Sequence, residues 1–182
     1  MAIRDLLLLG NPLLNQRSEP VQRAELSAAV AVGQDLRDTM NSFREKHGWG
    51  RAIAAPQIGV LKRIAYLQVD KPWLIINPVV SALSEEMMDL WDDCMSFPDL
   101  LARVKRHVCF TLAYHDENWR EHQLRIDGVF SELLQHEIDH LDGVLAVSKA
   151  IDGASFALQS QRHLLAGAVF ANNPKPDSDY PE

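Results

Sequence analysis

The stretch Gln135-His136-Glu137-Ile138-Asp139-His140 decides how this chain is organised, because it carries the pattern HExxH. In a helix, His136 and His140 lie one turn apart on the same face, so both imidazoles can bind one metal ion. Glu137 lies beside them as a candidate base for a water that the metal activates. Two histidines do not complete a metal site. The rest of the chain must therefore supply a third ligand and a group that stabilises an oxyanion.

The helix that carries this stretch is predicted to span residues 129–141. Gly128 precedes it, and Asp142-Gly143 is a typical helix end. Helical spacing places five residues of this helix, including both histidines, on one face. These five are Val129, Glu132, Leu133, His136 and His140.

Length and composition predict one globular domain. The chain has 182 residues, of which 47% are apolar. We expect a single domain over residues 1–170, and a disordered tail over residues 171–182, where Asn, Pro, Lys, Asp and Ser dominate. The net charge is −7, from 25 acidic and 18 basic residues, and no basic block stands out. Direct binding of nucleic acid is therefore not expected.

The sequence also predicts a cytoplasmic protein. The apolar run Leu6–Leu9 is too short for a signal peptide, and no later segment is long enough to span a membrane. The two cysteines, Cys94 and Cys109, are too few for a disulfide framework, which favours a reducing compartment.

Periodicity outlines the other elements. A long amphipathic helix is predicted from about Ala24 to Lys46, ended by Gly48. Residues 63–69 and 74–80 are predicted strands, residues 104–114 alternate as one strand, and residues 119–126 return after a turn. Residues 144–147 are predicted as a strand and residues 155–168 as a weaker helix.

Two further stretches contain residues with chemical potential. Residues 50–59 are rich in small residues, and Pro56 would fix a turn that holds the Gln57 amide in place. That amide could bind a substrate or an oxyanion, although the stretch also fits an ordinary tight connection. In residues 92–96, Cys94 is the only plausible soft ligand outside a strand. His107 and Cys109 fall in the alternating strand and are not expected to bind metal.

In this order, residues 50–57, 92–96 and 135–140 resemble the three signature motifs of the peptide deformylases. The family patterns are roughly Gly-x-Gly-x-Ala-Ala-Pro-Gln, Glu-Gly-Cys-Leu-Ser and Gln-His-Glu-x-Asp-His. The resemblance extends from about residue 6 to about residue 150. It implies an α+β fold in which antiparallel β-sheets wrap around a central helix that carries HExxH, with a long N-terminal helix and a short C-terminal helix.

The resemblance also implies roles for individual residues. Cys94, His136 and His140 would bind one divalent metal ion, usually Fe2+, with Zn2+, Ni2+ or Co2+ as substitutes. Glu137 would be the general acid and base, while Gln57 and the backbone N–H of Met95 would stabilise the oxyanion. The residues expected to contact the substrate are Arg51, Ala52, Ile53, Leu90, Phe97, Val129, Glu132 and Leu133.

The chain departs from the family patterns at several positions. Ala52 replaces a glycine, Leu101 replaces a frequent arginine, and Asp92-Asp93 replaces Glu-Gly. Asp92 keeps a carboxylate that could pair with Arg106 as the family's Glu does, and Asp139 is expected to support the site from behind the ligands.

Two charged residues stand where the family's pocket for the formyl-methionine side chain is usually apolar. These are Arg51 and Glu132. We hypothesise that they pair across the pocket mouth, or that the pocket takes a side chain other than methionine. In the alternative reading, both side chains point to solvent.

The leading functional hypothesis is hydrolysis of the N-formyl group from the N-terminal formyl-methionine of newly synthesised proteins, releasing formate. The alternatives are a deformylase-fold amidase with a different N-formyl substrate, a zinc endopeptidase suggested by HExxH alone, and a catalytically silent metal-binding paralogue. The expected partner is an N-formylated peptide or nascent chain, bound by a monomer or weak dimer. Ribosome docking is left open, because the last predicted helix offers few basic residues beyond Lys149, Arg162 and His163.

Overall fold

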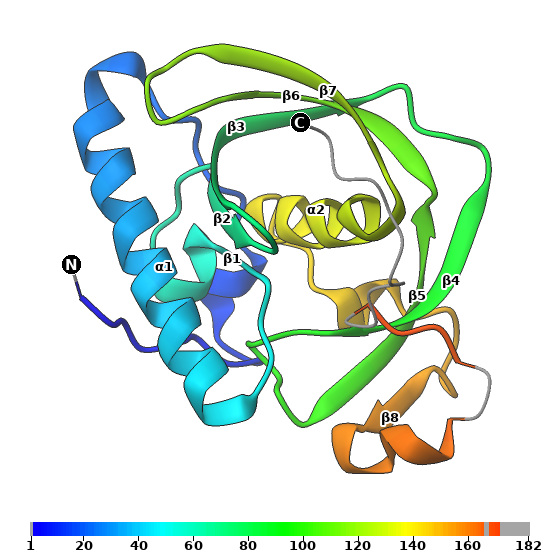
Figure 1. Ribbon diagram of the computed structural model, residues 1–182. Helices are drawn as coiled ribbons and strands as arrows, with labels where there is room; N and C mark the ends of the chain where they lie inside the picture. The colour runs from blue at the N-terminus through cyan, green and yellow to red at the C-terminus, as the bar shows by residue number, and fades with distance from the viewer. Residues whose placement is uncertain (1, 166–167, 172–182) are drawn as a thin grey trace.

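Two antiparallel sheets and two long helices make up the fold of residues 2–165 and 168–171, the part of the chain that the computed structural model describes (Figure 1). The five-stranded sheet has the order β1 (Ala52–Ala54), β2 (Ile64–Gln68), β3 (Pro72–Ser81), β6 (Cys109–His115) and β7 (Glu121–Asp127). The three-stranded sheet has the order β4 (Met87–Asp93), β5 (Leu100–His107) and β8 (Phe156–Leu158). The predicted α+β class is therefore confirmed.

Helix α1 (Leu26–His47) matches the predicted amphipathic helix over residues 24–46. It begins slightly later because residues Arg23–Glu25 form a 3-10 turn, and it ends where Gly48 adopts a left-handed φ of 77°. Its apolar side chains, including Leu36, Met40 and Phe43, pack on one face of the five-stranded sheet. No helix in the described part of the chain is both long and apolar enough to cross a membrane.

Helix α2 (Gly128–Leu141) carries HExxH and is enclosed between the two sheets (Figure 1). Strand β2 shows how the two faces of the sheet pack against the two helices. Ile64 and Tyr66 face the cluster around α1, whereas Ala65 and Leu67 face the cluster that includes residues of α2. Because successive strand residues point to opposite faces, a strand covered on both faces reads as a continuous apolar run.

The ends and orientation of α2 are set by local contacts. The Gln135 side chain donates to the His107 carbonyl at 2.9 Å and accepts from the His107 N–H at 3.0 Å, which fixes α2 against the end of β5. After the helix, Gly143 has a φ of 74°, and a Cβ there would lie 2.7 Å from the carbonyl oxygen of Asn15. A glycine is therefore required at this close approach.

The prediction of a single strand over residues 104–114 is wrong, because the chain passes from one sheet to the other there. Strand β5 pairs with β4, whereas β6 pairs with β3 and β7. At the break, the Val108 N–H donates to the Glu86 carbonyl at 3.1 Å. The alternation of apolar side chains continues across the break, so side-chain periodicity does not reveal the change of backbone partner. Strand β4 itself was not predicted.

The chain after α2 also differs from the prediction. Residues 144–147 form no strand, and a 3-10 helix covers Ala146–Lys149. The predicted helix over residues 155–168 is instead β8, which pairs with β5, followed by a short 3-10 helix at Gln159–Leu164. Residues 166–167 of that prediction lie outside the described residues. Pairing with β5 has overridden a weak local helix preference.

The last described residues return to β4. The Trp91 N–H donates to the Val169 carbonyl at 2.8 Å, and the Ala171 N–H donates to the Trp91 carbonyl at 3.0 Å. Ala171 was predicted as the first residue of a disordered tail, but its side chain is buried. Residues 172–182 of the predicted tail lie outside the described residues.

Candidate metal centre and active site

Three side chains from two distant parts of the chain meet beside α2. Cys94 follows β4, and His136 and His140 come from α2. The Cys94 Sγ and the His136 Nε2 each lie 3.2 Å from the His140 Nε2, and all three side chains are buried. Their ligand atoms lie within 4.8 Å of one another, so the three residues could hold one metal ion. Within the described residues, His107 and Cys109 belong to no such group.

The orientation of His136 is set by Asp92. The His136 Nδ1 donates to the Asp92 carboxylate at 3.0 Å, which turns the Nε2 toward His140. Arg106, which is fully buried, donates to the same carboxylate at 2.7 Å and also pairs with Asp139. Burial alone would raise the pKa of Asp92, but His136 and Arg106 outweigh it and hold that pKa well below its ordinary value. The predicted Asp92–Arg106 pair is thus present, and Asp139 supports the ligands through Arg106.

The chemistry of the three donors fits a metal ion. Burial, reinforced by the neighbouring His136, lowers the pKa of His140 well below its ordinary value, which favours the neutral imidazole that binds metals. One thiolate and two imidazoles are donors that suit zinc and other first-row divalent metals. Both cysteines of the chain are free thiols, so Cys94 is available as a ligand.

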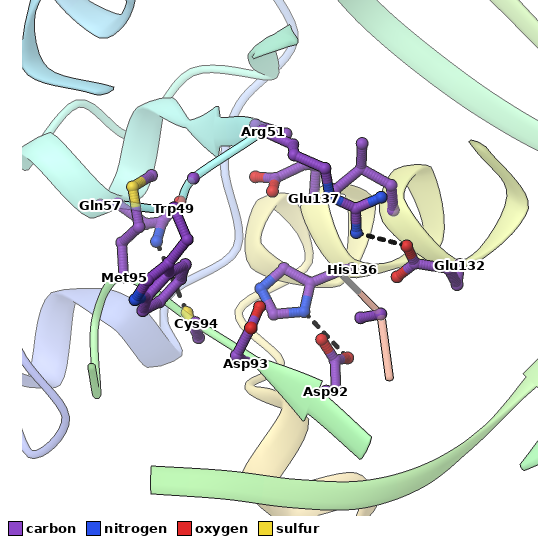
Figure 2. A pocket seen from close by; sticks show the side chains of 14 residues that line it. Trp49, Arg51, Gln57, Asp92, Asp93, Cys94, Met95, Glu132, His136 and Glu137 are labelled. Carbon is purple, nitrogen blue, oxygen red and sulfur yellow. Dashed lines mark hydrogen bonds and ion pairs between the residues drawn. The ribbon is translucent and has the colours of Figure 1, made fainter. Parts of the chain in front are cut away.

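The amide of Gln57 is fixed in one orientation. Its Oε1 accepts from the Ala54 N–H at 2.9 Å, while its Nε2 points to Ser96 Oγ at 3.2 Å and Cys94 Sγ at 3.6 Å (Figure 2). The turn that holds it is a 3-10 helix over Ala55–Ile58, which Pro56 pre-organises. The donor end of the amide therefore points toward the candidate ligands, next to Met95, which lines the same pocket.

Glu137 has a carboxylate that the fold does not satisfy. It is buried, and its Oε2 has no hydrogen-bond partner among the described residues. Burial raises the pKa of Glu137 to about 7, although His136 opposes the rise. Buried polar atoms are normally paired, so an unpaired carboxylate oxygen beside three candidate ligands is typical of a functional group.

Arg51 and Glu132 form an ion pair at the same pocket. The Arg51 Nη2 lies 2.5 Å from the Glu132 Oε1, and the two side chains are only 16% and 5% exposed. This confirms the hypothesis that they pair and rules out the reading in which both point to solvent. Burial raises the pKa of Glu132 to about 7, against the opposing effect of Arg51. Figure 2 shows the guanidinium of Arg51 reaching across from the segment before β1 to Glu132 on α2.

The pocket itself has a volume of about 20 Å³, which is room for about one water molecule. Among the residues expected to contact substrate, Arg51, Ala52, Glu132 and Leu133 line it. Ile53, Leu90 and Phe97 instead lie in hydrophobic core clusters, and Val129 is partly exposed and outside the lining. Ala52 and Ile53 are separated because neighbouring strand residues point to opposite faces.

Five lining residues were not among the predicted site residues: Trp49, Gly50, Asp92, Asp93 and Ala171. Trp49 directly precedes the first motif, and Asp93 directly precedes Cys94, so neighbourhood to a motif could have suggested both. Ala171 gave no local signal, because it reaches the pocket only when the chain folds back onto β4. Asp93, which stands where the family has glycine, does not adopt a left-handed φ, so the replacement brings no backbone strain.

A family model of polypeptide deformylases matches residues 3–155. The chain belongs to the polypeptide deformylase family. Among the curated members that it resembles, the peptide deformylase of Leptospira biflexa is 35% identical over 161 residues, covering 82% of this chain and 88% of that protein. The peptide deformylase of Parafrankia sp. is 35% identical over 178 residues, covering 97% and 92% of the two chains.

The fold of this deformylase also resembles solved structures of the family. The crystal structure of a peptide deformylase from Synechococcus elongatus in complex with actinonin aligns with a TM-score of 0.73 at 30% identity, covering 84% of this chain and 87% of that one. The resemblance seen in the three sequence motifs is thereby confirmed. The reading of HExxH as an endopeptidase signature is set aside.

Proposed function

We propose that this deformylase hydrolyses the formamide bond of N-formylated peptides, with Cys94, His136 and His140 holding one divalent metal ion. As a member of the peptide deformylases, the chain is a hydrolase whose substrates are formylated peptides and nascent chains. The observation that carries the proposed mechanism is the meeting of three ligand atoms within 4.8 Å, beside the unpaired Glu137 carboxylate and the fixed Gln57 amide.

A divalent metal held by the three ligands would supply the Lewis acidity that makes water a nucleophile near neutral pH. Glu137 takes a proton from the attacking water and returns it to the departing amine nitrogen. Water adds to the formyl carbon, the carbon–nitrogen bond breaks, and the products are formate and a free amine. Burial raises the pKa of Glu137, which suits a carboxylate that must both accept and release a proton.

Gln57 supports the reaction through its Nε2, which donates to the carbonyl oxygen as that oxygen gains negative charge. The Met95 backbone N–H is proposed as the second donor. A fixed donor of this kind lowers the barrier by about 3 kcal/mol in other oxyanion holes. The contact of the Gln57 Oε1 with the Ala54 N–H supports this role, because the amide does not need to reorient during the reaction.

The small pocket supports formyl as the acyl group that is removed. A formyl carbon carries only hydrogen beside its oxygen and nitrogen, so it can approach the ligands in a space of about 20 Å³. Acetyl and longer acyl groups would need additional volume there. A tight wall can discriminate against each added carbon by about 10–200-fold.

We further propose Fe2+ as the metal ion in the cell, with Zn2+, Ni2+ or Co2+ able to replace it. Imidazole ligands suit all of these metals, and the resemblance to deformylases favours iron. A thiolate ligand bound to Fe2+ is prone to oxidation, which suits the reducing conditions of the cytoplasm.

The test is to purify the protein under anaerobic conditions, measure bound metal per chain, and assay release of formate from formyl dipeptides. We expect one metal ion per chain and formate in proportion to free amine. One metal ion per chain without formate from any formyl dipeptide would contradict the proposal. It would favour the silent metal-binding paralogue.

A further inference from the structure

The pocket that contains the reacting groups also contains the Arg51–Glu132 ion pair. One continuous lining includes Gln57, Cys94 and Glu137 together with both members of the pair. A substrate whose formyl carbon lies among the first three must place its neighbouring atoms in the same pocket. The side chain next to the formamide nitrogen would then lie near Arg51 and Glu132, which Figure 2 shows beside Glu137 and His136.

The pair joins two neighbouring elements of the pocket wall, β1 and α2. Arg51 lies directly before β1, and Glu132 lies one helical turn before His136 on the buried α2. The remaining space is about 20 Å³, between the pair, the apolar Leu133 and the small Ala52 and Ala171. A side chain as long as methionine can enter only by separating the pair or by packing directly against its charged atoms.

Either route is unfavourable for an apolar side chain. Separation leaves two charges in a buried site without their main partner, and a thioether offers only a weak acceptor in exchange. A neutral polar side chain can donate to the carboxylate and accept from the guanidinium, so it replaces the contact that it disturbs. When Glu132 is ionised, the pair has no net charge, so a charged side chain would then leave one charge uncompensated.

We propose that the Arg51–Glu132 pair makes this deformylase prefer N-formyl peptides whose first side chain is a neutral amide or hydroxyl over those that begin with formyl-methionine. The inference rests on the proposed function, since it concerns the specificity of the same site. Arg51 and Glu132 are then specificity-determining residues, and they take no part in the proton transfers.

The experiment compares formyl-Gln-Ala with formyl-Met-Ala, because glutamine and methionine have unbranched side chains of comparable length. With the metal-loaded protein, we expect kcat/KM to be at least tenfold higher for formyl-Gln-Ala, since a site that hydrogen-bonds a polar group discriminates strongly against analogues without it. Equal rates, or a preference for formyl-Met-Ala, would overturn the inference and leave the proposed function intact. Absence of formate from both peptides would overturn the proposed function and the inference with it.

A double variant separates the pair from the rest of the pocket. Arg51→Leu with Glu132→Leu should reverse the preference and favour formyl-Met-Ala, and an unchanged preference would contradict the inference. The matched control is Asp89→Leu with Arg103→Leu, which removes an exposed ion pair of 2.7 Å between β4 and β5 and should keep the preference for glutamine. If the double variant fails to fold, Glu132→Gln preserves the volume and should lower the ratio of the two kcat/KM values severalfold. An unchanged ratio would again contradict the inference.

Discussion

The two halves of the pocket are built differently. In the reaction half, His136 is held by contacts behind it, which run from Asp139 through Arg106 to Asp92. In the side-chain half, the buried Arg51–Glu132 ion pair joins the segment before β1 to α2. Helix α2 serves both halves, because His136 and Glu132 lie one turn apart on it. The residues of the two halves are therefore held by different contacts, although both halves include residues of α2.

This difference has a consequence for how each half tolerates change. The reaction half depends on a chain of buried charges, so removing any member leaves its neighbour uncompensated. The side-chain half contains a buried ion pair, which two apolar residues of similar volume could replace together. Single substitutions in the reaction half should therefore lower the reaction rate. Joint replacement of the ion pair should instead change which substrate side chain is preferred.

The largest expected effect is on the reaction half. Glu137→Ala removes the proposed base without touching a ligand, so kcat should fall by roughly 10²–10⁴-fold. Bound metal per chain, measured by elemental analysis, should remain as in the unchanged protein. Glu45→Ala removes an exposed carboxylate near the end of α1 and should have no effect on kcat. Retained turnover in Glu137→Ala would refute the role of Glu137 as base.

A smaller effect is expected behind the ligands. Asp92→Asn weakens the acceptor for His136 and leaves the buried Arg106 short of a charge partner, so metal affinity should fall by about 10–100-fold. Asp89→Asn is the matched control, because it makes the same change on the same strand in an exposed pair with Arg103. Metal titration followed by competition with a chelator would compare them. Equal affinities in the two variants would show that Asp92 does not support His136.

The smallest effect concerns stability in the side-chain half. The double variant Arg51→Leu with Glu132→Leu should have a free energy of unfolding equal to, or about 1–4 kcal/mol above, that of the unchanged protein. Urea denaturation of the metal-loaded proteins measures it. A loss of several kcal/mol would mean that the pair holds the fold together and would weaken its assignment to specificity.

The metal centre could be predicted from the sequence because its signals are local. HExxH fixes two ligands by helical spacing, Cys94 lies in a short motif, and Gly128 and Gly143 bracket the helix. The pairing of Arg51 with Glu132 followed from their unusual charge at positions expected in an apolar pocket. Spacing alone pairs the two histidines, whereas the resemblance to the deformylases assigned Cys94 as third ligand and placed Arg51 and Glu132 at the pocket.

The errors arose where the partner of a segment decides its structure. Residues 104–114 alternate without interruption, yet β5 and β6 belong to different sheets because β5 pairs with β4. Residues 155–168 have a weak helical pattern, and β8 forms there because its backbone pairs with β5. Ile53 was expected at the pocket wall, and its position on β1 turns it toward α1 instead. None of these partners can be identified from local periodicity.

The most direct test of the account is a competition assay on the metal-loaded protein. Formyl-Gln-Ala and formyl-Met-Ala are mixed at equal concentration, and the two free dipeptides are followed by mass spectrometry, so their initial rates give the ratio of kcat/KM values. The account predicts that both dipeptides are released, and Gln-Ala at least ten times faster. Faster release of Met-Ala would contradict the polar specificity of the Arg51–Glu132 pair, and release of neither would contradict the deformylase chemistry.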